Sequence, residues 1–122
     1  MTLVEAIRQV VIDKGINAVY IVDAPVAGEC VLITPYMAET HEGAEASENK
    51  FQLYCASDTF VTSESLAWKV FRSLEGAIPP KCDRQILGSV YALQEPFFLD
   101  KDAKNRYIHC FNIAVNAVWK GE

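Results

Sequence analysis

The amino-acid sequence predicts an α+β fold: a two-layer sandwich of a mixed or antiparallel sheet of about five strands, with two helices on one face. Two segments repeat apolar residues at helical spacing, and five others are β-rich or alternate apolar with polar residues. Their order along the chain is α-β-β-β-α-β-β, without an internal repeat. Two amphipathic helices need an apolar sheet face to cover, so we expect both helices on the same face.

The length and composition predict a single domain over residues 1–122, since 51% of the residues are apolar. A chain of this size buries roughly two thirds of the surface that it exposes when unfolded. It has no apolar run of about 18 residues, the length that a membrane-spanning helix needs. Its start resembles no signal peptide, so we expect the protein to stay in the cytoplasm where it is made.

The first third of the chain predicts a helix and two strands. Thr2 and Glu5 have the spacing of a capping box, and Lys14-Gly15 resembles a helix end. Between them, apolar residues recur at helical spacing: Leu3, Ile7, Val10 and Val11. Residues 18–22 and 30–34 then predict short strands that end at Asp23-Ala24-Pro25 and at Pro35.

An acidic segment over residues 37–49 predicts a mobile loop. It contains four glutamates and neither Lys nor Arg: Glu39, Glu42, Glu45 and Glu48. A helix is the less favourable interpretation, because glutamates three residues apart repel on one face and Gly43 interrupts the segment. This loop is a candidate channel-lining or partner-contacting segment, although such a series is more often a solvated surface.

The second half predicts a third strand, a helix and a hairpin. Phe51, Leu53 and Cys55 alternate with polar neighbours, which indicates a strand. The helix is expected over Ser63–Glu75, capped by Thr62 or Ser63, with Trp68 lying off its apolar stripe. Segments 85–93 and 106–119 are expected to pair as a hairpin, whose loop begins with three large apolar residues: Phe97, Phe98 and Leu99.

The sequence contains no catalytic, cofactor-binding or metal-binding signature, so we predict neither an enzyme nor a cofactor. His109 and Cys110 are neighbours on a strand and must face opposite sides of the sheet. Cys55 and His109 could meet across the sheet, but inert core residues are commoner in apolar alternation. Nothing suggests an oxidising compartment, so the four cysteines are expected to be separate thiols.

Four apolar residues in unusual places are candidate interface residues: Trp68, Phe97, Phe98 and Leu99. Each one could equally be buried in the domain itself. Several together favour a protein that buries surface against other chains. The net charge of −5 and the lack of a basic stripe argue against binding to nucleic acid through its phosphates.

Four motifs in this chain resemble the tail-terminator proteins of long-tailed bacteriophages, a family also labelled minor capsid proteins. The most specific is Ala92-Leu93-Gln94-Glu95-Pro96-Phe97-Phe98-Leu99, followed by Asp100, Asp102, Arg106 and Tyr107. Weaker matches are Gly15-Ile16-x-x-Val19-Tyr20, residues 31–36 and Ser65-Leu66-Ala67-Trp68. The family loop usually has a glycine where Asp100 or Asn105 stands here, so the turn itself is expected to differ.

The resemblance implies a structural virion protein of the tail or neck, made in the host cytoplasm. Such proteins form rings, usually hexameric, that cap the tail tube and present a surface to the head-tail connector. The implied partners are further copies of the chain, the tail tube protein and the connector, with DNA passing through the channel and no membrane contact. The alternatives are a small cytosolic α+β ligand-binding domain or enzyme, or another phage neck or head-completion component.

Overall fold

The computed structural model describes residues 1–25, 27–40 and 46–119. Its elements follow the predicted order, except that two short strands stand in place of the strand expected over 85–93, and a third short strand stands where the hairpin loop was expected. In chain order they are α1 (Leu3–Asp13), β1 (Val19–Ile21), β2 (Cys30–Thr40), β3 (Ser47–Ser57), α2 (Phe60–Leu74), β4 (Arg84–Ile86), β5 (Tyr91–Ala92), β6 (Phe97–Lys101) and β7 (Tyr107–Trp119).

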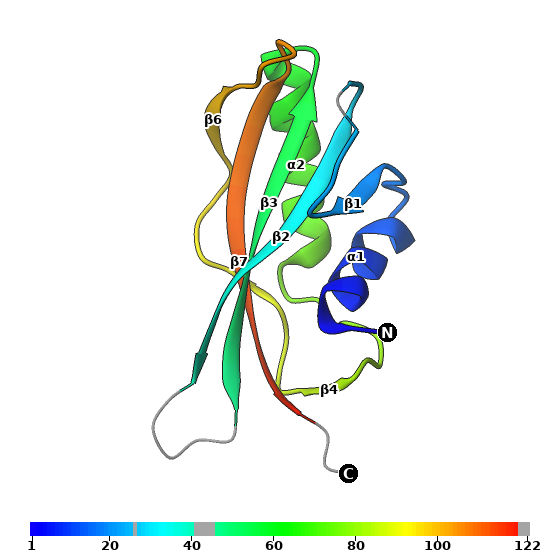
Figure 1. The fold of residues 1–122 in the computed structure, drawn as a ribbon, viewed down its shortest axis with the longest axis vertical. Coiled ribbons are helices and arrows are strands. Elements are labelled where there is room, and N and C mark those ends of the chain that lie inside the picture. The colour runs from blue at the N-terminus through cyan, green and yellow to red at the C-terminus, as the bar shows by residue number, and fades with distance from the viewer. Residues whose placement is uncertain (26, 41–45, 120–122) are drawn as a thin grey trace.

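The strands form one mixed sheet whose long members are β2, β3 and β7 (Figure 1). β1 runs parallel to β2, and every other pairing among the described strands is antiparallel. The free side of β7 is taken by three short strands in succession, β4, β5 and β6. The predicted α+β fold is therefore confirmed.

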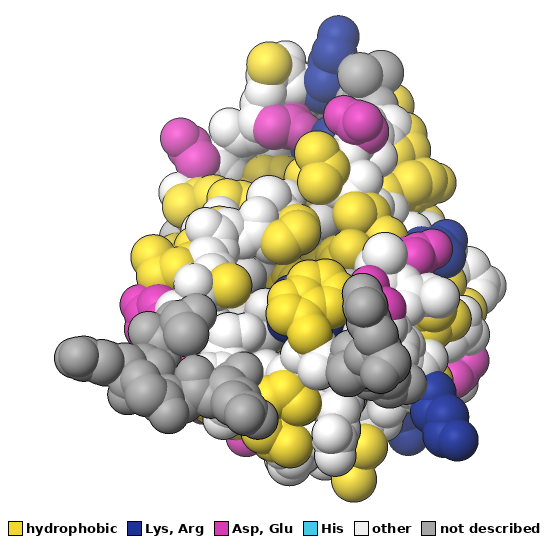
Figure 2. All heavy atoms as spheres, turned by 60° about the horizontal axis from the view of Figure 1, so that its bottom comes forward, with side chains coloured by type: hydrophobic (Ala, Val, Ile, Leu, Met, Phe, Trp, Pro, Cys, Tyr) yellow, Lys and Arg dark blue, Asp and Glu magenta, His cyan; other side chains and the backbone are white. Residues whose placement is uncertain are grey.

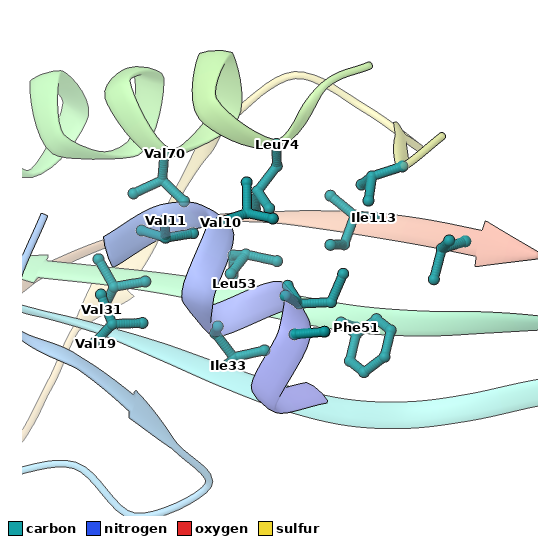
Figure 3. Packing of buried hydrophobic residues seen from close by; sticks show 14 of the residues in the cluster. Val10, Val11, Val19, Val31, Ile33, Phe51, Leu53, Val70, Leu74 and Ile113 are labelled. Atoms are coloured by element: carbon teal, nitrogen blue, oxygen red, sulfur yellow. The ribbon is translucent and has the colours of Figure 1, made fainter. Parts of the chain in front are cut away.

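Both helices lie on the same face of the sheet, and the core fills the space between the two layers (Figure 3). Side chains at alternate positions of the long strands point toward the helices, as period-two geometry requires. Those that Figure 3 labels on the strands are Val19, Val31, Ile33, Phe51, Leu53 and Ile113, which meet Val10, Val11, Val70 and Leu74 from the helices.

The helix ends explain one agreement with the sequence and one difference. α1 has the predicted capping box, in which the Thr2 hydroxyl accepts from the Glu5 backbone and the Glu5 carboxylate accepts from Thr2. α2 begins three residues earlier than predicted, because Thr59 is its cap. Thr62, one of the two expected caps, is instead the third helical residue. Its hydroxyl accepts from the Thr59 backbone N–H, and its own N–H donates to the Thr59 hydroxyl, which completes a capping box.

Two predicted connections are corrected by the strands. The expected loop over 37–49 was drawn too long, since β2 continues to Thr40 and β3 begins at Ser47; positions 41–45 lie outside the described residues. The expected hairpin loop that begins at Phe97 was wrong. Phe97–Lys101 is strand β6, which pairs with β7 and has an irregular register between Phe98 and Asp100.

Candidate interaction surfaces

Strand β6 presents three large apolar side chains at the edge of the sheet. Phe97, Phe98 and Leu99 retain 41%, 42% and 49% of their accessible surface. Phe98 stays partly engaged with its own domain, because its ring lies 5.2 Å from that of Phe60 and 5.5 Å from that of His109. Among the described strands only β7 pairs with β6, so the outer edge of β6 is available to another chain.

Trp68, the fourth predicted interface residue, has a different environment. It is half-buried on α2, and its ring meets Phe71 edge to face at 5.2 Å. Phe71 in turn contacts the buried Phe111 at 5.5 Å. Trp68 therefore extends the aromatic packing of the core outward, while the three β6 residues are exposed along the edge of the sheet.

The turn between β6 and β7 is held by Arg106. Its Nε donates to the Asp102 carboxylate at 2.7 Å, and one terminal nitrogen donates to the Pro25 and Gly28 carbonyls at 3.1 Å each. Burial opposes ionisation of Asp102, but hydrogen bonds from Arg106 and Lys104 prevail and lower the pKa of that carboxyl. This part of the family-like motif thus fixes the loop beside β6 onto the β1–β2 connection.

The predicted acidic segment is not a bare row of negative charge. Glu39 and Glu48 stand opposite each other on β2 and β3, and Lys50 Nζ lies 3.2 Å from Glu39 and 3.5 Å from Glu48. The Tyr91 hydroxyl also donates to Glu48, and desolvation followed by this carboxylate raises the pKa of Tyr91 to about 12. The other two predicted residues, Glu42 and Glu45, lie outside the described residues.

A groove opens at the end of the sheet opposite β6, where the strands continue past the start of α1. We call it the Trp119 groove; it measures about 500 Å³. Its main lining residues are Leu3, Met37, Phe51, Arg84 and Trp119. The Arg84 guanidinium lies 3.6 Å from the centre of the Trp119 ring, and Trp119 remains 67% exposed. Seen from this end, hydrophobic side chains gather on the surface (Figure 2).

Arg84, which lines this groove, has a buried hydrogen-bonding group without a partner among the described residues. Its Nη1 atom is buried and has no hydrogen-bond partner among the described residues. A guanidinium nitrogen loses the hydration of its charge when it is buried, so such a group normally has a carbonyl or carboxylate partner. The Trp119 groove is therefore mostly apolar in lining, with a guanidinium beside it whose buried nitrogen has no partner among the described residues.

The Cys55–His109 pair foreseen from the sequence does exist, as cross-strand partners beneath α2. Ser63 joins them: its hydroxyl donates to the Cys55 carbonyl at 2.9 Å and lies 2.8 Å from His109 Nδ1. Since the hydroxyl proton is used in this way, Nδ1 must be the donor to Ser63. Desolvation raises the pKa of the Cys55 thiol and lowers the pKa of His109, so both remain neutral core groups.

Metal-binding clusters, membrane-spanning helices and disulfides are absent from the described part of the chain. No group of three or more His, Cys, Asp or Glu side chains there could hold a metal ion. None of the described helices is long and apolar enough to cross a membrane. All four cysteines are buried free thiols.

The fold and its surfaces define an α+β protein with apolar surface at a sheet edge and at one end of the sheet. The chain belongs to the bacteriophage tail terminator protein family, whose model matches residues 4–119. Among solved structures, it is similar to a chain of the virion of a native gene transfer agent particle. The two share 16% identity, with a TM-score of 0.71 over 96% of this chain and 95% of that one. Curated protein sequences give no significant match.

Sequence reasoning missed Arg84 and Lys50 as contributors to these surfaces. Arg84 is a lone basic residue in a short strand, and no local pattern indicates that it stacks on Trp119. Lys50 follows directly after the acidic segment, so the pairing of β2 with β3 would have revealed its contact with Glu39. Both residues become informative only when the register of the sheet is known.

Proposed function

We propose that this protein is a structural virion component that assembles into a hexameric ring, caps the tail tube and offers the docking surface for the head. Family membership over residues 4–119 supports this proposal. The structural observation that carries it is β6, an edge strand whose five residues are all exposed and three of which are large and apolar. An edge of that kind is a liability unless a neighbouring chain covers it.

The proposal assigns ring contacts to Phe97, Phe98 and Leu99, with Trp68 as a secondary candidate. Full burial of a side chain of this size contributes roughly 1.5–3 kcal/mol, and less than half of this remains to be gained, because 41–49% of each surface is exposed. Covering two or three of them once per subunit therefore adds to the free energy that holds neighbouring subunits together. The work of the protein is then mechanical: a closed ring stops tube growth and presents one face to the connector.

The acidic hairpin of β2 and β3 is proposed to face the channel or a partner protein. Glu39 and Glu48 share a single Lys50, which leaves one net negative charge in that group of three. With the net charge of −5 for the chain, this favours a channel wall past which DNA slides without binding.

Tail tubes polymerised in the absence and presence of the protein test the function directly. We expect added protein to stop tube growth, and light scattering to give the mass of a ring of about six chains on this proposal. The Phe97→Ser variant should remain folded, but it should neither form the ring nor stop tube growth. Ile78→Ser is the matched control, because Ile78 is also apolar and exposed but lies outside β6.

Two results would reject the proposal. A protein that stays monomeric with or without tubes and leaves tube growth unchanged would favour the ligand-binding alternative. Binding to a portal or connector in the absence of any effect on tubes would place the protein among neck or head-completion components.

A further inference from the structure

We infer that β6 of one copy docks in the Trp119 groove of the next copy, so that this single contact, repeated, builds the assembly. The inference rests on the proposed ring function and names the occupant of the groove: residues 97–100 of a second chain. Strand β6 lies toward one end of the molecule, and β4 and the end of β7, which line the Trp119 groove, lie toward the other (Figure 1). A contact between two different surfaces is head-to-tail and closes into a ring when the rotation between neighbours permits it.

The lining of the groove is complementary to an occupant that combines apolar side chains with a carboxylate. Its walls include Leu3, Met37 and Phe51, and Trp119 covers one face of the Arg84 guanidinium. The buried Nη1 atom of Arg84 has no partner in the described part of the chain. The guanidinium also has no ion-pair partner among the described residues, so a carboxylate that enters the groove would pair with its charge.

The charged neighbours of Arg84 do not fill that role within the subunit. Asp83 also lines the groove, yet no ion pair joins it to Arg84 among the described residues. Lys50, the other charged residue of the lining, already contacts Glu39 and Glu48. The local charge therefore leaves the guanidinium as the group that selects the partner.

Residues 97–100 carry the complementary pattern in consecutive positions. Phe97 and Leu99 are exposed apolar side chains, and Asp100 adds an exposed carboxylate directly after them. Phe98 points to the helix-bearing face and stays with Phe60, so it can anchor the strand while its neighbours reach another chain. The change of register between Phe98 and Asp100 breaks the regular alternation, which frees Leu99 from the β7 ladder.

The backbone of the groove wall can also take part. β1 pairs with β2 at Val31–Ile33, and no described strand pairs with the outer edge of β2 where Met37 and Ala38 line the groove. The outer edge of β6 is likewise unpaired among the described strands. Addition of one free strand edge to another supplies main-chain hydrogen bonds, while side-chain pockets supply specificity.

Two variants that damage opposite sides of the contact provide the test. Trp119→Ala removes the groove wall, and a Phe97→Ser, Leu99→Ser double variant removes the docking strand; all three positions are exposed, so both proteins should fold. Each variant alone should be monomeric. Mixed in equal amounts, they retain one intact contact per pair, so light scattering should show a two-chain complex and nothing larger.

Charge and position are tested separately. Asp100→Asn should raise the protein concentration at half-assembly by at least about tenfold, since a desolvated charge would lose its partner. A photoreactive benzophenone amino acid in place of Leu99 should form its cross-link with Met37 or Trp119 of another copy. The cross-linked peptides are located by mass spectrometry after assembly of rings from protein that carries the label at position 99 and is otherwise wild-type.

The outcomes separate this inference from the ring proposal. A ring-forming wild-type protein whose mixed variants stay monomeric, or whose cross-link falls outside the groove, would overturn the docking of β6 while leaving the ring intact. A cross-link to the tube protein would do the same. A wild-type protein that forms no ring, alone or on tubes, would overturn the ring proposal, and this contact with it.

Discussion

Phe111 and Trp119 are aromatic residues on the same strand and the same face of the sheet, yet their environments are opposite. Phe111 has no accessible surface and contacts Phe71 of α2, whereas Trp119 is 67% exposed and stacks on Arg84. Both positions are odd-numbered members of β7, so period-two geometry points them to the same side. The difference between them is the cover: α2 lies over Phe111, and the sheet extends past the helices at Trp119 (Figure 1).

This difference divides one continuous face of the sheet into a covered part and an exposed part. The part beneath the helices stabilises the subunit, because its side chains leave water when the chain folds. The part beyond the helices is exposed, and our proposal assigns it to a contact with another chain. Substitutions in the first part should therefore change the free energy of unfolding, and those in the second should change assembly.

The largest expected effect is at the covered end. Phe111→Ala should lower the free energy of unfolding by about 3–5 kcal/mol, because it removes a fully buried ring and leaves a cavity between β7 and α2. Urea denaturation followed by circular dichroism measures the change. A loss of less than about 1 kcal/mol, a size typical of exposed substitutions, would mean that α2 does not cover this position as described.

A smaller loss is expected at Ser63, the polar residue of the covered end. Ser63→Ala should cost about 1–3 kcal/mol, since the Cys55 carbonyl and His109 Nδ1 would both lose a buried partner. Ser65→Ala is the matched control on the same helix, because Ser65 is exposed. Equal stability of the two variants would show that the Ser63 hydroxyl is not needed by the core.

Much of the fold could be predicted because helical and alternating periodicities are local properties. α1 with its capping box, the existence of β2, β3 and β7 and the placement of both helices on one face all follow from such patterns. The length of β2 does not, because the strand was expected to end at Pro35 and continues through it to Thr40. The start of α2 was misplaced because Thr59, Thr62 and Ser63 are all acceptable caps, and only the turn after β3 selects Thr59.

The surfaces were less predictable, because they depend on which strand lies beside which. Phe97, Phe98 and Leu99 were recognised as unusual for a loop, but pairing with β7 makes them an edge strand. Glu39 and Glu48 were treated as part of a mobile acidic segment, whereas the β2–β3 register brings Lys50 between them. The Trp119 groove is formed by α1, β2, β3, β4 and β7 together, so no single segment reveals it.

The pH dependence of stability offers a finer probe of the covered end. Desolvation lowers the pKa of His109 below its usual 6.5, although Glu64 opposes this shift. Between the lowered pKa and 6.5 the unfolded chain binds more protons than the folded one, so stability should decrease as the pH falls through this window. Above it, His109 contributes no slope.

Two variants test whether the dependence of stability on pH arises from His109. Glu64→Gln should lower the pKa of His109 further and extend the window to lower pH, because it removes the charge that favours the imidazolium. His109→Gln should abolish the slope in this range. Denaturation midpoints measured in a series of buffers between pH 5 and 7 test both, and a wild-type protein without any slope there would contradict the burial of His109.

The smallest change in the free energy of unfolding is expected at Trp119, the exposed end of β7. This change decides whether the two ends of the strand differ as described. Trp119→Ala removes a ring as large as any in the core, but that ring keeps most of its contact with water. What the subunit loses is mainly the contact with the Arg84 guanidinium, and an exposed cation–π contact of this kind contributes about 0.5–1 kcal/mol. The free energy of unfolding should therefore fall by no more than about 1 kcal/mol, several times less than for Phe111→Ala. Denaturation of both variants under the same conditions measures the ratio directly. If Trp119→Ala instead cost as much as Phe111→Ala, the two ends of β7 would both belong to the folding core, and the division of this face between stability and assembly would be wrong.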